Sequence, residues 1–229
     1  MGMLFLLQIK YLSKLKKMKK LIASVFVLSL LFISCKEKVK EEKVIEAKPE
    51  TENIASAVYN VNSETSVLNW KGFKPTGTHN GTVSVKEGSF EVKEGNLIAG
   101  KFVFNMNTIE VLDIPKEEEG NGKLVGHLNS GDFFDVENNP TATFEITDVV
   151  NGENASIKGD LTVKGITKSI EFPVTLTSSD AGIKLSGATF KIDRTDFDIQ
   201  YKSKKFFDNL KDKFINDEFE ISFEVNASK

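Results

Sequence analysis

Apolar and polar residues alternate with a period of two through most of the chain after Tyr59. The alternation is clearest in residues 101–106, 142–147, 169–176 and 218–225. Because successive side chains of a β-strand point to opposite faces, each segment predicts a strand with one dry face and one wet face. Further strands are expected at 66–73, 81–85, 89–92, 156–163 and 182–192. Eight or nine short antiparallel strands predict an all-β domain, either a sandwich or a closed barrel.

The segments between these strands carry turn and helix signals. Turns are expected at 86–88, 93–96, 151–154 and 178–182, where glycine, asparagine, serine and charged residues gather. Short helices are expected at 123–129 and at 206–214, and the second would place Phe207, Leu210 and Phe214 on one face. Residues 112–122 are predicted to form an acidic loop.

The N-terminal region has the pattern of a secretory signal. An apolar run begins at Leu21 after Lys19 and Lys20, and it ends at Cys35, the only cysteine of the chain. The last four residues, 32–35, resemble a bacterial lipobox, which predicts that Cys35 is lipidated. The alternative is a transmembrane helix, but the apolar run is about 13 residues and a bilayer needs roughly 20. Translation is expected to start at Met18, or at Met1 with an upstream extension.

These features divide the chain into three parts. Residues 1–34 are predicted to be the signal peptide, with 1–17 as an extension of it, and 35–57 a lipidated tether rich in Lys and Glu. Residues 58–229 are predicted to form the β-domain. The expected location is the bacterial cell envelope, on a membrane facing the periplasm or the cell surface. A membrane-spanning barrel would show the same alternation, but the lipobox and the helical interruptions favour a barrel with a dry interior.

The charge balance excludes several partners. Without residues 1–34, which hold six lysines and no acidic residue, the chain has 24 basic and 33 acidic side chains, a balance of −9. An acidic surface argues against nucleic acid and against docking on anionic lipid by charge alone. With one cysteine, no intramolecular disulfide can form. The sequence leaves a monomer and a homodimer both open.

The two histidines, His79 and His127, lie in glycine-containing segments. One interpretation is a metal or acid–base site completed by Asp132 or Asp193. Metal centres usually take three protein ligands, and no cluster of that kind is visible, so no metal and no cofactor are expected. The favoured interpretation is that both histidines hydrogen-bond to loops at one end of the barrel.

Arg194 is the only arginine, in the polar segment 191–198. Its planar fork suits a carboxylate or a phosphate. One interpretation is that Arg194 anchors an anionic head group. The favoured one is an internal ion pair, with Asp193 or Asp132, that fixes a loop. None of the common nucleophile, phosphate-binding or dinucleotide-binding motifs is present, so the chain is not expected to be an enzyme.

Several short segments, in order along the chain, resemble one known family. They are 66–72, 77–83, 126–136, 139–144, 159–168 and 192–197. They are similar to the YceI-like family, also described as polyisoprenoid-binding periplasmic proteins, over about residues 58–226. The resemblance implies a lipocalin-like antiparallel barrel whose lumen holds a long isoprenoid-type chain, with no established catalytic residues. Its matching segments nominate His127, Leu128, Asp132, Phe133, Phe134, Arg194, Asp196 and Phe197.

The sequence therefore predicts a single lipocalin-like β-barrel of about eight strands with one or two short helices. The predicted function is a membrane-anchored protein that carries or sequesters an isoprenoid-type or fatty-acyl ligand in its lumen. Two rivals remain: a structural lipoprotein with a solid core, and a hydrolase or isomerase that uses the two histidines and an aspartate. The expected ligand-binding residues are Trp70, His79, Phe102, Phe104, Met106, His127, Phe133, Phe134, Phe144, Phe172, Phe190, Arg194 and Phe197.

Overall fold

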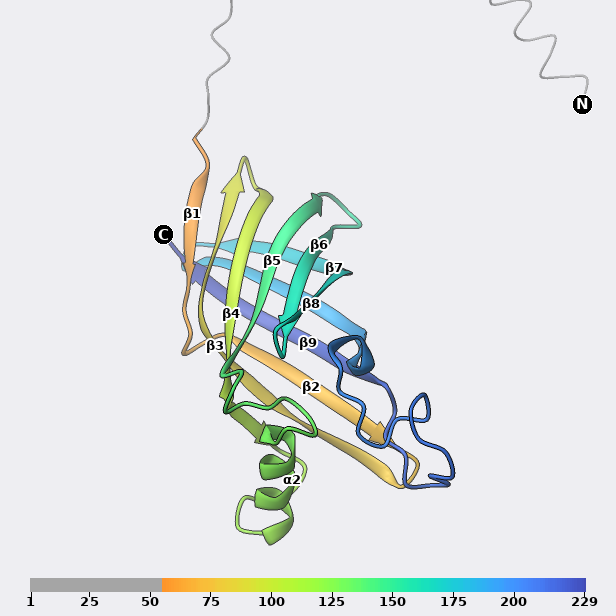
Figure 1. Cartoon of the computed structure of the whole chain (residues 1–229). Coiled ribbons are helices and arrows are strands. Elements are labelled where there is room, and N and C mark those ends of the chain that lie inside the picture. Colours follow the sequence, from red (N-terminus) through yellow and green to blue (C-terminus); the bar gives the residue numbers. More distant parts are fainter. Residues whose placement is uncertain (1–54) are drawn as a thin grey trace, which may run out of the picture. The chain divides into compact units, whose positions relative to one another are not determined.

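A computed structural model describes residues 55–229 (Figure 1). The predicted signal peptide, the lipidation of Cys35 and all of the predicted tether before residue 55 lie outside the described residues. No helix among residues 55–229 has both the length and the apolar character needed to cross a membrane.

The described residues form one closed antiparallel β-barrel, as predicted. Every strand pairs antiparallel with the next along the chain from β2 to β9, and the pairing of β2 with β9 closes the barrel. The strands are β1 (Ala57–Val61), β2 (Val67–Lys74), β3 (Gly77–Lys93), β4 (Asn96–Val111), β5 (Thr141–Val150), β6 (Ser156–Val163), β7 (Ile166–Ser179), β8 (Gly182–Asp193) and β9 (Glu218–Ser228).

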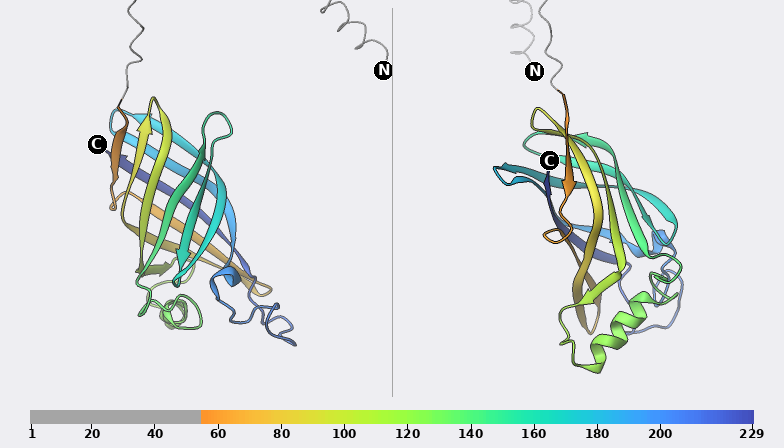
Figure 2. Two further views of the ribbon diagram at one scale, coloured as in Figure 1. Left: turned by 45° about the horizontal axis from the view of Figure 1, so that its top comes forward. Right: turned by 90° about the vertical axis from the view of Figure 1, so that its left-hand side faces the viewer.

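The first two strands share one place in the barrel wall. Strand β2 pairs with the first half of β3, from Gly77 to Ser84, whereas β1 pairs with its second half, from Ser89 to Val92. Both also pair with β9. The barrel wall therefore has eight strand positions, one of them filled by two strands in succession. Strand β1 begins at the end of the barrel that also holds the chain's C-terminus (Figures 1 and 2).

The turn predicted at residues 86–88 is wrong. Strand β3 continues through these residues and carries a β-bulge instead, where the register with β4 shifts between Val85 and Glu87. Gly88 serves close packing here: a Cβ at this position would lie 2.9 Å from the carbonyl oxygen of Lys101 and 3.0 Å from the Phe102 ring. The turn predicted at 93–96 is confirmed, with Glu94 and Gly95 both at positive φ, as a two-residue hairpin turn of the primed type requires.

One α-helix lies in the described part of the chain. Helix α2 (Glu119–Asn129) begins four residues earlier than predicted and so takes in the end of the expected acidic loop. The side chain of Asn121 ties it to the barrel by donating to the carbonyl oxygens of Val111 and Ile114, at 3.0 and 2.7 Å. Figure 2 shows α2 at the end of the barrel opposite to the start of β1. We call these two ends the α2 end and the β1 end.

The helix predicted at 206–214 is wrong. This segment is irregular and follows the short 3-10 helix η2 (Arg194–Phe197) at the α2 end. Asn209 and Lys211 adopt left-handed backbone angles, with φ of 60° and 52°, which interrupt a right-handed helix. Phe206 and Phe207 consequently remain about half exposed instead of covering the barrel.

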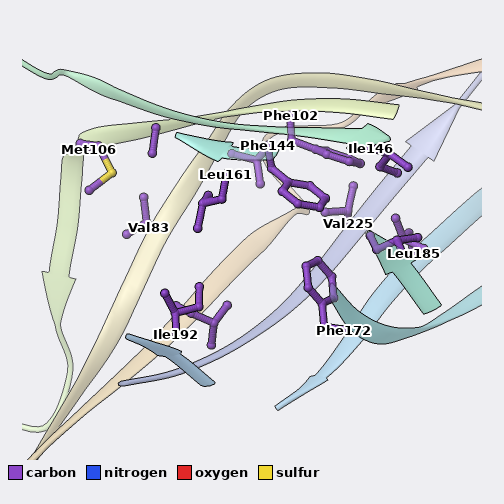
Figure 3. Close-up of a cluster of buried hydrophobic side chains, with 14 of the residues drawn as sticks. Val83, Phe102, Met106, Phe144, Ile146, Leu161, Phe172, Leu185, Ile192 and Val225 are labelled. Atoms are coloured by element: carbon purple, nitrogen blue, oxygen red, sulfur yellow. The ribbon is translucent and has the colours of Figure 1, made fainter. Parts of the chain in front are cut away.

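The hydrophobic core lies inside the barrel. Figure 3 shows side chains from strands on different sides of the wall converging there, including Phe102, Phe144, Phe172 and Val225. The predicted alternation is confirmed on β9, where Ile221 and Val225 are buried between more exposed neighbours. The dry face of each strand thus faces the lumen.

Candidate functional site: an apolar lumen with a polar mouth

The lumen holds a cavity of about 170 Å³, which we call the inner cavity. All eight strands from β2 to β9 contribute side chains to it, as do the segments that cross the α2 end. The lining is almost wholly apolar, since only Trp70, Arg194 and Asn216 carry polar side-chain atoms. Such a surface binds apolar groups by excluding water and offers few hydrogen bonds.

Aromatic rings form one side of the inner cavity. Phe172 on β7 stacks on Phe190 on β8, with ring centroids 4.1 Å apart and an interplanar angle of 4°. Phe144 and Phe223 lie 5.3 and 5.7 Å from Phe172, tilted and edge-on. Gly187 makes room for this cluster, because a Cβ there would overlap the Phe223 ring.

A second cavity of about 510 Å³, the outer cavity, lies at the α2 end. It shares Trp70, Gly72, Leu128, Phe133 and Ile215 with the inner cavity, so these residues lie between the two cavities. Eight of its ten remaining lining residues carry polar side-chain atoms. The ten residues are Phe73, Lys74, Thr76, His79, Leu124, His127, Tyr201, Lys202, Asp212 and Lys213.

His79 holds a loop at this end by a hydrogen bond, as the favoured interpretation predicts, whereas His127 makes an ion-pair contact without a hydrogen bond. His79 Nδ1 lies 2.8 Å from Asp113 Oδ2, and the Asn80 N–H donates to Asp113 Oδ1 at 2.8 Å, which ties β3 to the segment after β4. Burial alone would raise the pKa of Asp113, but these hydrogen bonds and the histidine outweigh it and lower the pKa.

His127 Nε2 lies 3.4 Å from Asp132 Oδ2, and the His127 ring packs edge-on against Tyr201 and Phe133. The expected partner Asp132 is therefore found for this histidine, whereas His79 pairs with Asp113, which the sequence reasoning did not consider. Among residues 55–229 no group of three or more metal-ligating side chains is positioned to hold a metal ion.

Arg194 is a buried loop staple and is only 4% exposed. It donates to the carbonyl oxygens of Ile199, Ile215 and Asn216 at 2.6 to 3.1 Å, and to Asp217 Oδ1 at 3.4 Å. Burial lowers the pKa of Arg194, and Asp217 and Asp193 partly offset this effect. The internal-pair interpretation holds, but the partner is Asp217.

Asp193 pairs instead with Lys205, whose Nζ donates to it at 2.5 Å. With its donors engaged by main-chain oxygens, Arg194 has little left to offer a head group.

The structure divides the predicted site residues into three groups. Phe197 is buried and lines neither cavity, while His79 and His127 line the outer cavity. The other predicted residues line the inner cavity, and two of them, Trp70 and Phe133, also line the outer cavity. The predicted residues of the inner cavity are Trp70, Phe102, Phe104, Met106, Phe133, Phe134, Phe144, Phe172, Phe190 and Arg194. Their part in ligand binding stays a prediction.

Sequence reasoning missed two sets of lining residues. Aliphatic side chains such as Leu68, Leu161 and Ile170 lie on the dry strand faces, so extending the alternation would have found them. Lys74, Tyr201, Lys202 and Lys213 come together at the mouth only through the irregular segment after η2. No local sequence pattern signals that arrangement.

A closed antiparallel barrel with an apolar lumen, adjoined at one end by a cavity with charged side chains, is the architecture of a lipocalin-like protein. Residues 59–227 match the family model described as YceI-like domain. The chain therefore belongs to the YceI-like family.

Two relatives are similar in sequence to part of this chain. The UPF0312 protein PA0423 of Pseudomonas aeruginosa is 41% identical over 97 residues, 42% of this chain and 46% of the relative. Protein YceI of Escherichia coli O17:K52:H18 is 35% identical over 103 residues, 44% of this chain and 49% of the relative. The chain thus spans about half the length of the curated relatives it matches.

Solved structures show the same fold. BcnA of Burkholderia cenocepacia aligns with a TM-score of 0.58 at 18% identity, covering 73% of this chain and 99% of BcnA. A protein described as a polyisoprenoid binding domain, from Saccharophagus degradans, aligns with a TM-score of 0.52 at 14% identity, covering 74% and 98%.

Proposed function

We propose that this protein is a membrane-anchored lipid-binding protein, which carries or sequesters a long apolar chain of isoprenoid or fatty-acyl type in its lumen. The observation that carries the proposal is an apolar inner cavity that adjoins a second cavity, lined in part by charged side chains, at one end of the barrel. The family membership supports the proposal, as does the fold shared with a protein described as polyisoprenoid-binding.

The dimensions favour a ligand that occupies both cavities. Pockets for small molecules usually measure about 300–1,000 Å³. The inner cavity of about 170 Å³ is smaller than this, whereas the outer cavity of about 510 Å³ lies within the range. Each buried methylene contributes roughly 0.8 kcal/mol, so even a few isoprene units in the inner cavity give useful affinity.

The membrane anchor is part of the same proposal and rests on sequence. Cys35 ends an apolar run preceded by lysines, the pattern of a lipoprotein signal. Lipidation would hold the barrel at a membrane of the cell envelope, close to the source of its ligand. We propose no catalytic step, because binding an apolar chain needs none.

The test uses the protein with Cys35→Ser, which needs no detergent that would compete for the lumen. Native mass spectrometry and solvent extraction of the purified protein are expected to show a co-purified apolar chain, or uptake of a fluorescent lipid probe. Absence of both would refute lipid carriage and favour the solid-core protein. A turnover that His127→Ala abolishes would favour the enzyme.

A matched pair of variants locates the binding. Ala142 is buried and lines the inner cavity, so Ala142→Phe places a ring in the lumen. The neighbouring Thr143 has the opposite orientation on β5, so Thr143→Phe adds the same ring outside the lumen. Uptake of the probe is expected to fall in Ala142→Phe and to persist in Thr143→Phe.

A further inference from the structure

We propose that the outer cavity binds an anionic oxygen-bearing head group, and that Trp70 Nε1–H donates a hydrogen bond to one of its oxygens. This inference rests on the proposed lipid-binding function. It also assigns an orientation to the ligand, in which the apolar tail lies in the inner cavity and the charged head group lies at the α2 end.

The indole nitrogen of Trp70 is a buried donor without an acceptor. Trp70 Nε1 is shielded from solvent and has no hydrogen-bond partner among residues 55–229. An indole N–H can only donate, and buried polar groups in proteins are nearly always paired because an unmade hydrogen bond is costly. This atom borders no open space in the structure, so an acceptor supplied by a ligand would complete the site only after the indole ring or a neighbour moves.

Trp70 stands where the two cavities meet, since it lines both. Its ring lies directly over Gly81, its antiparallel partner on β3: a Cβ on Gly81 would be 2.8 Å from Trp70 Cζ2. The close approach fixes the ring against the barrel wall. A ligand oxygen at this level would lie between the inner cavity and the charged side chains that line the outer cavity.

The charge of the outer cavity favours an anion. Lys74, Lys202 and Lys213 line it, and none of them forms an ion pair with a described residue. Asp212 is the only acidic residue in the lining. The mouth is therefore basic, although the chain as a whole has a net charge of −3.

Three lysines on the outer face of the barrel are paired, in contrast to those of the mouth. Lys101, Lys184 and Lys191 each pair with a glutamate on a neighbouring strand, at 3.7, 3.4 and 3.1 Å. The three lysines of the mouth have no such Glu or Asp partner among residues 55–229. A phosphate and a carboxylate share the chemistry that this site recognises, an anionic group with several acceptor oxygens.

The experiment compares ligands that share a tail and differ in the head group. Farnesyl phosphate is compared with farnesol, and palmitate with hexadecanol, by isothermal titration calorimetry on the Cys35→Ser protein. We expect at least one anionic ligand to bind about tenfold or more tightly than its alcohol. The anion that binds more tightly than its alcohol identifies the natural head group as a phosphate or a carboxylate.

Variants test the assigned residues. Lys202→Ala combined with Lys213→Ala should abolish the preference for the anion, whereas the exposed pair Lys158→Ala and Lys168→Ala, outside both cavities, should keep it. Trp70→Phe keeps a ring but removes the donor, and it should weaken binding of the anion and of its alcohol alike.

Trp70 is also the only tryptophan of the chain, so its fluorescence reports on this position alone. Saturating the protein with an anionic ligand is expected to change the fluorescence emission of Trp70. Unchanged emission, or equal affinity for anion and alcohol, would overturn this inference and leave lipid carriage intact. Failure of all four ligands to bind would overturn lipid carriage as well.

Discussion

The aromatic cluster of the lumen allows a quantitative test of whether the inner cavity is open. Phe172→Ala removes a ring that is 4% exposed, stacks on Phe190 and lines the inner cavity. Phe90→Ala removes a ring that is 1% exposed, contacts Tyr59 and Phe102, and does not line that cavity. The two variants share the same chemical change and differ in what surrounds the ring.

The expected cost follows from the terms of a buried deletion. Phenylalanine-to-alanine changes in cores destabilise by about 3–5 kcal/mol, which includes the transfer of the ring and the void it leaves. At Phe90 both terms apply, so we expect about 4–5 kcal/mol. At Phe172 the new space merges with a cavity already present, and the transfer term of about 1.5–3 kcal/mol and the aromatic stacking of about 1 kcal/mol remain. We expect about 3 kcal/mol.

Urea denaturation of the Cys35→Ser protein measures both values. Thermal unfolding gives a second measurement. Each kcal/mol shifts the melting temperature of a domain of this size by about 2–4 °C, so Phe172→Ala should lower it by about 6–12 °C. The Phe172→Ala variant should also still take up a fluorescent lipid probe. A cost at Phe172 equal to or above that at Phe90 would show that the lumen is packed solid around this ring, against the reasoning above.

Three further predictions concern single residues. Gly159→Ala would drive a Cβ into the Phe144 ring, and we expect urea unfolding to show a loss of about 1–3 kcal/mol. Arg194→Lys leaves main-chain oxygens of the loop staple without donors, and we expect a loss of about 3 kcal/mol by the same measurement. The folded protein lowers the pKa of Asp113 below its usual 3.8, so its pairing stabilises the fold above about pH 4 and loses this effect as the pH falls through the lowered value. Unfolding measured against pH should therefore show wild type and Asp113→Asn converging in acid.

Each of these predictions has its own control. Gly72→Ala, where a Cβ has no neighbour within 4 Å, should cost less than Gly159→Ala. Exposed Lys168→Ala should stay within about 0.5 kcal/mol of wild type, in contrast to Arg194→Lys. A difference between wild type and Asp113→Asn that stays constant down to pH 2 would contradict the assigned direction of the pKa.

The alternation of side chains made the barrel predictable because it records which face of each strand is dry. Phe102, Phe144 and Phe172 were assigned to the lumen on this ground, and all three line the inner cavity. The turn predicted at residues 86–88 was wrong because a glycine that permits close packing at a β-bulge cannot be distinguished in sequence from one that forms a turn.

The mouth was harder to predict because distant contacts build it. The spacing of Phe207, Leu210 and Phe214 fits a helix, but the left-handed residues Asn209 and Lys211 prevent it. Arg194 instead holds the chain on both sides of this segment, through the main-chain oxygens of Ile199 and Ile215, which any sequence would offer. Sequence periodicity carries no record of such contacts, so Lys202 and Lys213 could not be assigned to a site.

The placement of β1 has a consequence for the proposed lipid anchor at Cys35. Strand β1 starts at the end opposite to the outer cavity, and β8, with 12 residues, indicates that the tilted barrel is about 30 Å long. The roughly 20 residues from Lys36 to Ser56 can span at most about 70 Å. If Cys35 is lipidated as proposed, turning the mouth back to that membrane would use nearly half of that length. A short-tethered barrel would present its opening outward, toward an acceptor across the envelope, so shortening this segment should impair loading from its own membrane before it impairs delivery.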